Sequence, residues 1–175
     1  MRWQFVRIPL IAVALILGSA AAIWAFRVNF VVNVTASVPR GIYRLVPGEI
    51  QRGDLVKACL PDLWEVREAL GRHYLMKGVC PSGTSPVLKH VAALAGDAVV
   101  ISETGIAVNG KLILGSKPKE RDSNGEPLPV MSYAGILKSG EYVLVSENDP
   151  RGFDSRYLGV MRLPDAVRAE PFLTE

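Results

Sequence analysis

Hydrophobic residues follow two different patterns along the chain, and the first is a continuous run near the N-terminus. Residues 8–26 contain no charged residue and are apolar on every helical face. A helix of about 20 apolar residues spans the hydrocarbon core of a bilayer, so this run is long enough to cross. Trp3 and Trp24 lie near its ends, where amphipathic rings favour the headgroup layer. The pattern predicts a cytoplasmic tail over residues 1–7, a transmembrane anchor over residues 8–26 and an extracytoplasmic domain over residues 27–175.

Two other interpretations of the apolar run stay open. It is compatible with a buried core helix, although it is apolar all round and terminal. It is also compatible with a cleaved signal peptide, because Ala20, Ala21 and Ala22 offer small residues. Basic residues flank the run on both sides, so charge bias does not fix its orientation, and long domains cross largely regardless of charge.

The second pattern begins after the run and consists of short alternating stretches separated by Gly and Pro, which is typical of strands. The expected strands are residues 28–35, 41–46, 53–58, 86–94, 98–102, 105–108, 111–114 and 140–145. Asn109-Gly110 favours a tight hairpin turn between two of them. The polar segments 117–129 and 148–153 are predicted to be loops. The fold class is therefore mainly β.

One segment, residues 61–71, predicts a soluble helix. Asp62 is its expected cap, and Leu63, Val66 and Leu70 give it one apolar face. This makes a single helical excursion from an otherwise all-β domain.

Composition and charge favour one compact domain and argue against a nucleic-acid-binding protein. The 175 residues suit one compact domain plus an anchor, and 49% of them are hydrophobic while 21% are charged. The net charge is +3, and the basic residues are scattered rather than forming the stripe that phosphate backbones require. We expect no nucleic-acid partner.

The two cysteines, Cys59 and Cys80, flank the predicted helix and lie in no metal-binding spacing. In an oxidising compartment they could form a disulfide worth roughly 3 kcal/mol, which favours a domain outside the cytoplasm. Two unrelated buried thiols are the alternative. With His73 and His90 as the only histidines, no metal site and no cofactor are expected.

Lys89 is an unusual residue because it lies in the middle of a predicted strand. Val87 and Val91 are its neighbours on the same face, since side chains alternate along a strand. If that face is buried, the amine is desolvated and its pKa falls from about 10.4. A neutral amine can accept a proton from a serine hydroxyl, which is otherwise a poor nucleophile. The alternative is an edge-strand lysine whose amine reaches water, and from Lys89 alone that alternative is favoured.

Ser37 follows a predicted strand and precedes Val38-Pro39. Pro39 stiffens the turn, and Gly41 permits close approach of another chain or an unusual dihedral angle. The backbone N–H of Ser37 is a candidate oxyanion donor. By itself, Ser-x-Pro is merely a common turn.

Asp154 and Arg156 alternate onto one face of a segment expected to be extended. Such a pair either braces an active site or forms a surface ion pair of little energetic value, and without further context the surface pair is favoured. A hydrolase that uses His90 as its base is a rival interpretation, although both histidines resemble partly exposed polar side chains.

The motifs become specific when they are taken in order. After the apolar run come Ser-x-Pro-x-Gly-x-Tyr at residues 37–43, and then Pro-Gly at 47–48 with Arg-Gly-Asp-Leu-Val at 52–56. Leu-Lys-His-Val-Ala-Ala-Leu-Ala-Gly-Asp-Ala-Val at 88–99, Val-Asn-Gly at 108–110 and Phe-Asp-Ser-Arg-Tyr-Leu-Gly at 153–159 follow. This order resembles the type I signal peptidase family (S26), and in particular its conjugal-transfer branch, the TraF-type pilin-maturing proteases.

The resemblance implies a signal-peptidase-like antiparallel β domain held against the outer face of the inner membrane. It implies that Ser37 is the nucleophile and Lys89 the general base, with Asp154 and Arg156 as supporting residues. The substrate and oxyanion region would include Ser37, Pro39 and Gly41.

A departure from the family pattern concerns the support of the lysine. Gly152 occupies a place where housekeeping enzymes carry a serine that hydrogen-bonds the lysine. Support of the lysine is therefore expected from Asp154.

The implied function is a membrane-anchored serine endopeptidase that processes a membrane-borne precursor, a conjugative pilin, by cleavage or by cleavage with cyclisation. Its partners would be that precursor, inner-membrane lipid and components of conjugation or type IV secretion, with the catalytic domain in the bacterial periplasm. A housekeeping signal peptidase and a non-catalytic anchored subunit of a secretion or pilus assembly are the alternatives. The precursor, its cleavage site and the oligomeric state stay open.

Overall fold

The computed structural model describes residues 4–146 and 149–175, and for residues 4–10, 27 and 28 it describes the backbone alone. Three helices occur in this part of the chain: α1 (Gln4–Asn29), α2 (Trp64–Gly71) and α3 (Ser155–Leu158). The strands are β1 (Phe30–Asn33), β2 (Gly41–Val46), β3 (Leu55–Ala58), β4 (Val87–Ala93), β5 (Ala98–Ser102), β6 (Gly105–Val108), β7 (Lys111–Leu112), β8 (Tyr133–Ile136), β9 (Glu141–Val145), β10 (Met161–Arg162) and β11 (Val167–Thr174). The prediction of a mainly β chain is confirmed.

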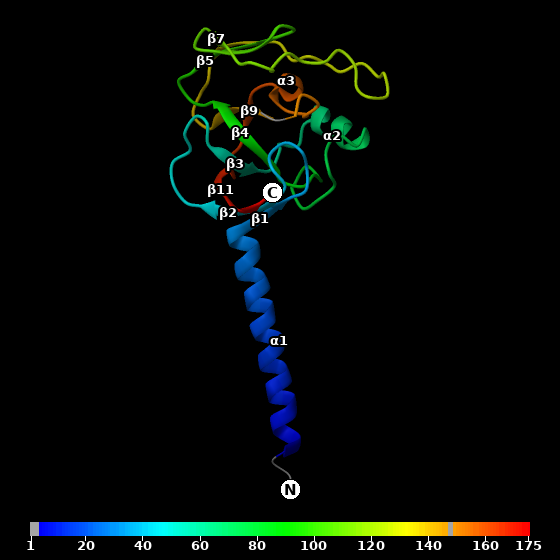
Figure 1. Cartoon of the computed structure of the whole chain (residues 1–175), viewed down its shortest axis with the longest axis vertical. Coiled ribbons are helices and arrows are strands. Elements are labelled where there is room, and N and C mark those ends of the chain that lie inside the picture. The colour runs from blue at the N-terminus through cyan, green and yellow to red at the C-terminus, as the bar shows by residue number, and fades with distance from the viewer. Residues whose placement is uncertain (1–3, 147–148) are drawn as a thin grey trace.

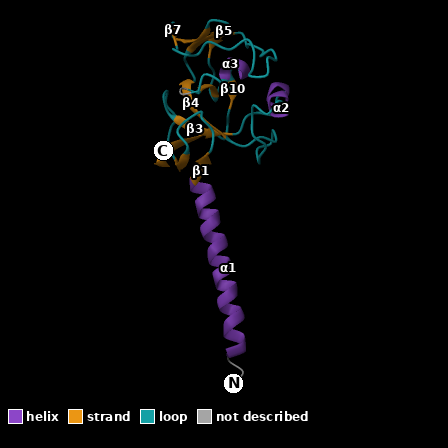
Figure 2. Ribbon diagram, turned by 45° about the vertical axis from the view of Figure 1, so that its right-hand side comes forward, coloured by secondary structure: helices purple, strands orange, loops and turns teal. Residues whose placement is uncertain are grey.

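The strands form two antiparallel sheets. The larger has the order β1-β2-β11-β3-β4-β9-β10, and the smaller has the order β7-β6-β5-β8. In both views α1 projects away from the globular part, and the smaller sheet lies at the opposite end of the molecule (Figures 1 and 2). The chain leaves the larger sheet after β4, builds the smaller one, and returns to pair β9 with β4. This return brings residues far apart in sequence next to β4.

Local sequence explains most of these strands. Their β-branched and aromatic residues suit a half-buried pleated surface. The larger sheet buries one apolar cluster around Val56 and Leu144 and another around Tyr43, and a further cluster lies between the smaller sheet and strands β4 and β9. Asn109 and Gly110 have φ angles of 50° and 78°, the left-handed values that a tight hairpin turn between β6 and β7 requires. The hairpin predicted from this dipeptide is confirmed.

The N-terminal helix α1 joins the sheet through aromatic contacts. Phe26 stacks on Phe30 of β1, and Phe30 meets Phe172 of β11 edge to face, each at a centroid distance of 5.0 Å. Within the part of the chain that the structure describes, no helix combines the length and the apolar character needed to cross a membrane. The predicted anchor over residues 8–26 includes three residues whose side chains lie outside that part, and it stays a prediction.

The strand predicted over residues 28–35 is shorter than expected at both ends. Helix α1 continues to Asn29, whose Nδ2 donates to the carbonyl of Ala25 and so completes the last helical turn. Only Phe30–Asn33 is extended, because the chain turns immediately afterwards towards Ser37.

The helix predicted over residues 61–71 begins later and lacks its predicted cap. Leu63 occupies the N-cap position with no side-chain hydrogen bond, and Asp62 instead pairs with Arg67 at 2.9 Å. Leu63 is exposed, and the buried face consists of Val66 and Ala69. Val66 of the predicted apolar face is therefore buried, and the second buried residue of the helix is Ala69 rather than Leu70.

Strands β8, β10 and β11 have no counterpart among the predicted ones. Two of them contain strand-breaking residues, Gly135 in β8 and Pro171 in β11, and β10 has only two residues. Pro171 is tolerated because the register between β11 and β2 shifts between Pro171 and Leu173. The loop over residues 117–129 is observed, whereas Asn148 of the other predicted loop lies outside the described residues.

Cys59 and Cys80 form a disulfide with a Cα–Cα distance of 5.5 Å. The bridge closes a loop that contains α2 and the segment after it, and that segment lines the cleft described next. A covalent link therefore holds this wall of the cleft to the end of β3.

Candidate active site

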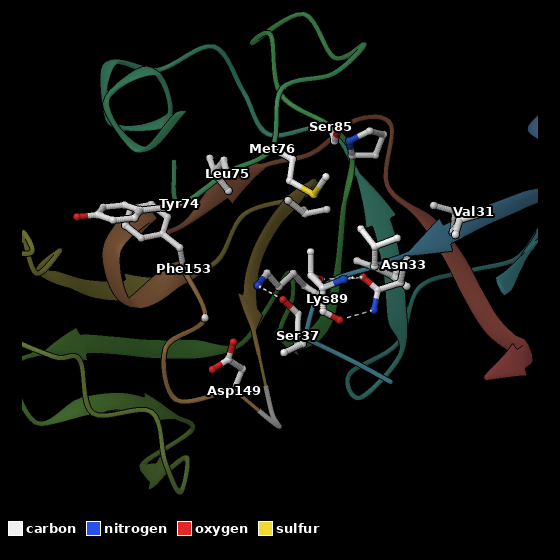
Figure 3. A pocket seen from close by; sticks show the side chains of 18 of the residues that line it. Val31, Asn33, Ser37, Tyr74, Leu75, Met76, Ser85, Lys89, Asp149 and Phe153 are labelled. Atoms are coloured by element: carbon white, nitrogen blue, oxygen red, sulfur yellow. Dashed lines mark hydrogen bonds between the residues drawn. The ribbon is translucent and has the colours of Figure 1, made fainter. Parts of the chain in front are cut away.

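A cleft of about 250 Å³ opens between β1, β4 and the loop that precedes α3 (Figure 3). One side is lined by residues 31–37, and the other by residues 74–76 and Phe153. Ser37 and Lys89 lie together in this cleft and face each other. The structure thus brings together the two side chains that the sequence singled out.

Ser37 lies in a turn that is fixed from both sides. Asn33, at the end of β1, donates through Nδ2 to the carbonyls of Thr35, Val38 and Pro39 at 2.9, 2.9 and 3.1 Å. Val38 points inwards and is only 2% exposed. Because the amide of Asn33 and the buried Val38 side chain hold the backbone, the intervening hydroxyl is presented to the cleft in one position.

Lys89 reaches this hydroxyl from β4. Its Nζ lies 2.9 Å from Ser37 Oγ and 2.5 Å from Ser146 Oγ, and the residue is 6% exposed. Burial lowers the pKa of Lys89 to about 8; the negative charge of Asp154 opposes this shift, and the positive charge of Arg156 adds to it. Of the two alternatives considered for Lys89, the structure shows the buried one and not the edge-strand lysine whose amine reaches water. An appreciable fraction of the amine is neutral at mildly alkaline pH.

Ser146 follows β9 and is the lysine's second hydroxyl partner. Strand β9 pairs with β4 so that Val145 lies opposite His90, which places the next residue, Ser146, opposite Lys89. The backbone N–H of Ser146 donates to Asp154 Oδ2 at 2.8 Å. Sequence reasoning missed this serine, because 57 residues separate it from Lys89 and no local motif marks it.

Gly152 lies directly against Ser146. A Cβ atom at position 152 would lie 2.2 Å from Ser146 Oγ and 2.4 Å from its Cβ, which is closer than real atoms approach. The hydroxyl of Ser146 therefore occupies space that a side chain at position 152 would need. The expectation that Asp154 supports the lysine directly is replaced by an indirect arrangement, in which Asp154 holds the backbone of Ser146 and Ser146 contacts Nζ.

Asp154 and Arg156 form a buried ion pair rather than the surface pair that the local sequence favoured. Asp154 is the N-cap of α3, and its Oδ1 accepts from both the backbone N and Nε of Arg156 at 3.1 and 2.8 Å. Their side chains are 0% and 2% exposed. The predicted extended segment is thus a helical turn, because an Asp cap followed by Ser favours helix initiation.

Arg156 also holds the loop that forms one wall of the cleft. Its guanidinium donates to the carbonyls of Pro150 and Gly152 at 3.2 and 2.7 Å. Arginine has five N–H donors in a fixed plane, and here they join the carboxylate to the loop. The pair therefore braces the site, as in the first of the two roles considered for it.

Pro39 and Gly41 do not line the cleft. The carbonyl of Pro39 accepts from Tyr43 Oη at 2.6 Å, behind the turn. Gly41 has a φ of 146°, and a Cβ there would lie 2.1 Å from the carbonyl oxygen of Leu173 in β11. Both conformational roles expected of Gly41 are observed, and they serve the pairing of β2 with β11.

Neither histidine belongs to the cleft. His73 is exposed after α2, and the His90 ring contacts the carbonyl of Gly53 at 3.2 Å. Among the described residues, no group of three or more His, Cys, Asp or Glu side chains is arranged to hold a metal ion. The cleft instead brings together a hydroxyl and an amine, which is an arrangement suited to proton transfer.

Comparison with known proteins places the chain in a family. The family model described as "Signal peptidase, peptidase S26" matches residues 2–169. The chain belongs to the signal peptidase S26 family. Membership in S26 implies serine protease activity in general, and it confirms the resemblance drawn from the ordered motifs.

Curated relatives of the chain have names from plasmid or conjugal transfer. A plasmid transfer protein TraF from Escherichia coli is 34% identical over 163 residues, covering 92% of this chain and 90% of its own. A second Escherichia coli protein of that name is 36% identical over 129 residues, covering 73% and 72%. A probable conjugal transfer protein TraF from Sinorhizobium fredii is 37% identical over 148 residues, covering 81% and 74%.

Among solved structures, the chain is similar to a signal peptidase I from Enterococcus faecalis, with a TM-score of 0.38 and 19% sequence identity. The superposed region covers 71% of this chain and 98% of the Enterococcus faecalis chain.

Proposed function

We propose that this chain is a serine endopeptidase in which Ser37 is the nucleophile and Lys89 the general base. The observation that supports this most strongly is the 2.9 Å separation of Lys89 Nζ and Ser37 Oγ, at an amine whose pKa is lowered to about 8. A hydroxyl becomes nucleophilic when a neutral base within hydrogen-bond distance can accept its proton.

The reaction begins with the neutral amine of Lys89. As Ser37 Oγ attacks the scissile carbonyl carbon, Nζ takes the hydroxyl proton and becomes an ammonium group. The resulting oxyanion is stabilised by hydrogen-bond donors at the turn, and the backbone N–H of Ser37 is our candidate. Collapse of this intermediate breaks the C–N bond, Lys89 returns the proton to the leaving amine, and an ester to Ser37 remains.

The ester is then released by a second nucleophile. Water gives a linear product with a new carboxylate. If an amine of the precursor itself attacks the ester, an amide forms, Ser37 is released and the product is cyclic. No water is consumed in this step. Lys89 serves as base in either case, because it is neutral again after protonating the first leaving group.

We propose a membrane-borne precursor as substrate, in particular a conjugative pilin. Supporting this, the relatives at 34–37% identity are called plasmid transfer and conjugal transfer proteins. Components of conjugation or type IV secretion would then be neighbours of the enzyme. A housekeeping signal peptidase would share the mechanism, and it would differ by restoring growth to a strain depleted of its own leader peptidase.

We further propose that residues 8–26 anchor the protein in the bacterial inner membrane, with the domain in the periplasm. The uncharged sequence of this segment supports the anchor. The Cys59–Cys80 disulfide supports the periplasm, since disulfides persist in oxidising compartments. Precursor and enzyme would then meet at one membrane face.

Mass spectrometry of a coexpressed candidate pilin tests the proposal. Wild type should convert the precursor, whereas Ser37→Ala and Lys89→Met should leave it intact, since each removes one partner of the proton transfer. The matched controls Ser139→Ala and Lys111→Met alter an exposed serine and an exposed lysine outside the cleft, and they should process normally.

Processing that persists in both cleft variants would favour a non-catalytic subunit or a base such as His90. A product lighter than the linear cleaved chain by one water establishes cyclisation.

A further inference from the structure

A second hollow of about 190 Å³ adjoins the active-site cleft. It shares three of its lining residues, Tyr74, Arg151 and Phe153, with the cleft. The remaining lining residues are Lys119, Arg121, Asp122, Ser123, Leu128 and Tyr157. We call this hollow the basic pocket. Because the two spaces share these residues, the basic pocket lies next to the cleft, on the side of Phe153.

An aromatic row leads from the cleft into the basic pocket. Tyr74 and Phe153 have ring centroids 5.2 Å apart, and Phe153 stacks on Tyr157 at 5.1 Å with an interplanar angle of 10°. The Tyr157 hydroxyl accepts from the backbone N–H of Lys119 at 2.9 Å, which ties the loop over residues 117–129 to the row. The far wall of the pocket is thereby held in place.

The charges that line the pocket are mainly positive. Lys119, Arg121 and Arg151 contribute cations, and Asp122 is the single carboxylate among the lining residues. That carboxylate is already engaged, because it accepts from Tyr74 Oη at 2.5 Å and from two backbone N–H groups of its own loop at 2.8 and 2.9 Å. The carboxylate keeps its charge, so three cations and one carboxylate leave the lining with a net positive charge.

Two of the cations keep donors available. One guanidinium nitrogen of Arg121 donates to the carbonyl of Gly125 at 2.7 Å, which orients the group and leaves further N–H donors of the five. Lys119 is exposed at the rim. Glu120 and Glu126 of the same loop are exposed and are not among the residues that line the pocket.

We propose that the basic pocket binds a carboxylate of the precursor, on the part of the substrate that extends past Phe153. The aromatic row packs against the apolar part of that segment, and Lys119 and Arg121 pair with the carboxylate. Either an acidic side chain of the precursor or the precursor's free C-terminus supplies this carboxylate. The inference rests on the proposed function, because it assumes that the cleft holds a peptide.

Binding of labelled peptides to the full-length Ser37→Ala chain in detergent micelles tests the pocket without requiring catalysis. The probes are short alanine-rich fluorescein peptides in three forms: a glutamate at successive positions with an amidated end, a glutamine with a free C-terminus, and a glutamine with an amidated end. Fluorescence polarisation gives each dissociation constant. We expect a carboxylate at the matching position to tighten binding about tenfold over the glutamine amide, which is typical of a charge-assisted hydrogen bond.

Variants then assign the effect to the pocket. Lys119→Gln with Arg121→Gln should abolish the preference for the carboxylate. Lys111→Gln with Lys138→Gln removes the same charge from exposed sites outside the pocket and should leave the preference unchanged. The position of the preferred glutamate, or a preference for the free C-terminus, identifies the source of the carboxylate. Equal melting temperatures show that all variants are folded.

The outcomes separate the pocket from the proposed function. The proposal that the basic pocket binds a carboxylate is overturned if no peptide carboxylate is preferred, or if the preference survives in Lys119→Gln/Arg121→Gln. If the preference follows the pocket residues while wild type cleaves no precursor, the pocket stands and the protease assignment fails. Ser37-dependent cleavage without the preference removes the pocket and leaves the protease assignment standing.

Discussion

The amine of Lys89 loses nearly all contact with solvent in the cleft, and under the proposed mechanism this sets the pH at which the site works. Burial lowers its pKa to about 8, and the carboxylate of Asp149 is among the charges that raise it again. The proposed mechanism needs the neutral amine, so kcat/KM should increase with pH through about 8 and level off above it. Below that pH the rate should fall about tenfold per unit, measured by steady-state cleavage.

Replacing Asp149 tests the electrostatic origin of this profile. Asp149→Asn removes a negative charge that stabilises the ammonium form, so the pKa of Lys89 should fall further and the rising limb should move to lower pH. Glu103→Gln, an exposed change in the turn between β5 and β6, should leave the limb in place. A limb that moves towards alkaline pH in Asp149→Asn would contradict the assignment of that limb to Lys89.

The contact between Ser146 and Lys89 predicts a role in positioning. Ser146→Ala leaves the amine without its 2.5 Å partner, and we expect kcat to fall about ten- to hundredfold with little change in KM. Gly152→Ser should also lower kcat, because the new Cβ overlaps the Ser146 hydroxyl.

The double change Ser146→Gly with Gly152→Ser gives the sharper test. It moves one hydroxyl from one side of the contact to the other, and it should recover part of the activity that Gly152→Ser alone loses. Equal losses in the single and double variants would show that the two positions do not share one space.

At the scale of elements, the pairing of β4 with β9 decides which side chains meet. Side chains alternate along a strand, so a slip of one residue would turn Lys89 away from the cleft and remove Ser146 from its side. Val91 and Leu144 are paired across these strands and are both about 1% exposed, so burial of that pair fixes the register. The candidate active site therefore depends on the same packing that stabilises the sheet.

The disulfide joins the end of β3 to the segment that carries α2 and one wall of the cleft. Cys59→Ser with Cys80→Ser should lower the free energy of unfolding by about 3 kcal/mol, because the unfolded chain gains entropy when the 21-residue separation is no longer closed. Chemical denaturation measures this difference.

Reductant should lower the stability of wild type and leave the serine variant unchanged. The variant should also show a raised KM, since residues 74–76 of the cleft wall lie within the released loop. Identical unfolding of both proteins under oxidising conditions would contradict the prediction.

At the scale of the whole molecule, the long helix α1 and the smaller sheet lie at opposite ends, and strands β1 and β4 lie between them (Figure 1). Residues of these two strands line the cleft. The aromatic contacts of Phe26, Phe30 and Phe172 join α1 to the edge of the larger sheet. If residues 8–26 lie in a membrane, these contacts keep the cleft close to that surface.

Charge substitutions test the anchor in the full-length chain. Wild type should stay with bacterial membranes after an alkaline carbonate wash, whereas Leu15→Arg with Ile16→Arg should release it, because each arginine costs about 2.5–3.5 kcal/mol at the centre of a span. Val79→Arg with Leu114→Arg alters two other exposed apolar residues and should not release it. Release of wild type by the wash would overturn the anchor.

The sequence by itself determined the mainly β character of the chain, the strands that carry Lys89 and its neighbours, and the Asn109-Gly110 turn. These features depend on residues close together in the chain, namely β-branched runs and the backbone preferences of Asn and Gly. The ordered motifs also identified Ser37 and Lys89 as a pair. No sequence pattern near either residue required their side chains to be adjacent in space.

Only the tertiary structure decided how that pair is held. The contact of Ser146 with Lys89, the space that Gly152 leaves for it, and the burial of Asp154 with Arg156 all arise where β9 and the loop after it return to β4. Such contacts depend on strand register and on the volume between distant segments, and a periodic pattern along the chain contains neither. The amide of Asn33, which fixes the turn of Ser37, was overlooked because three carbonyls had to converge on it in space.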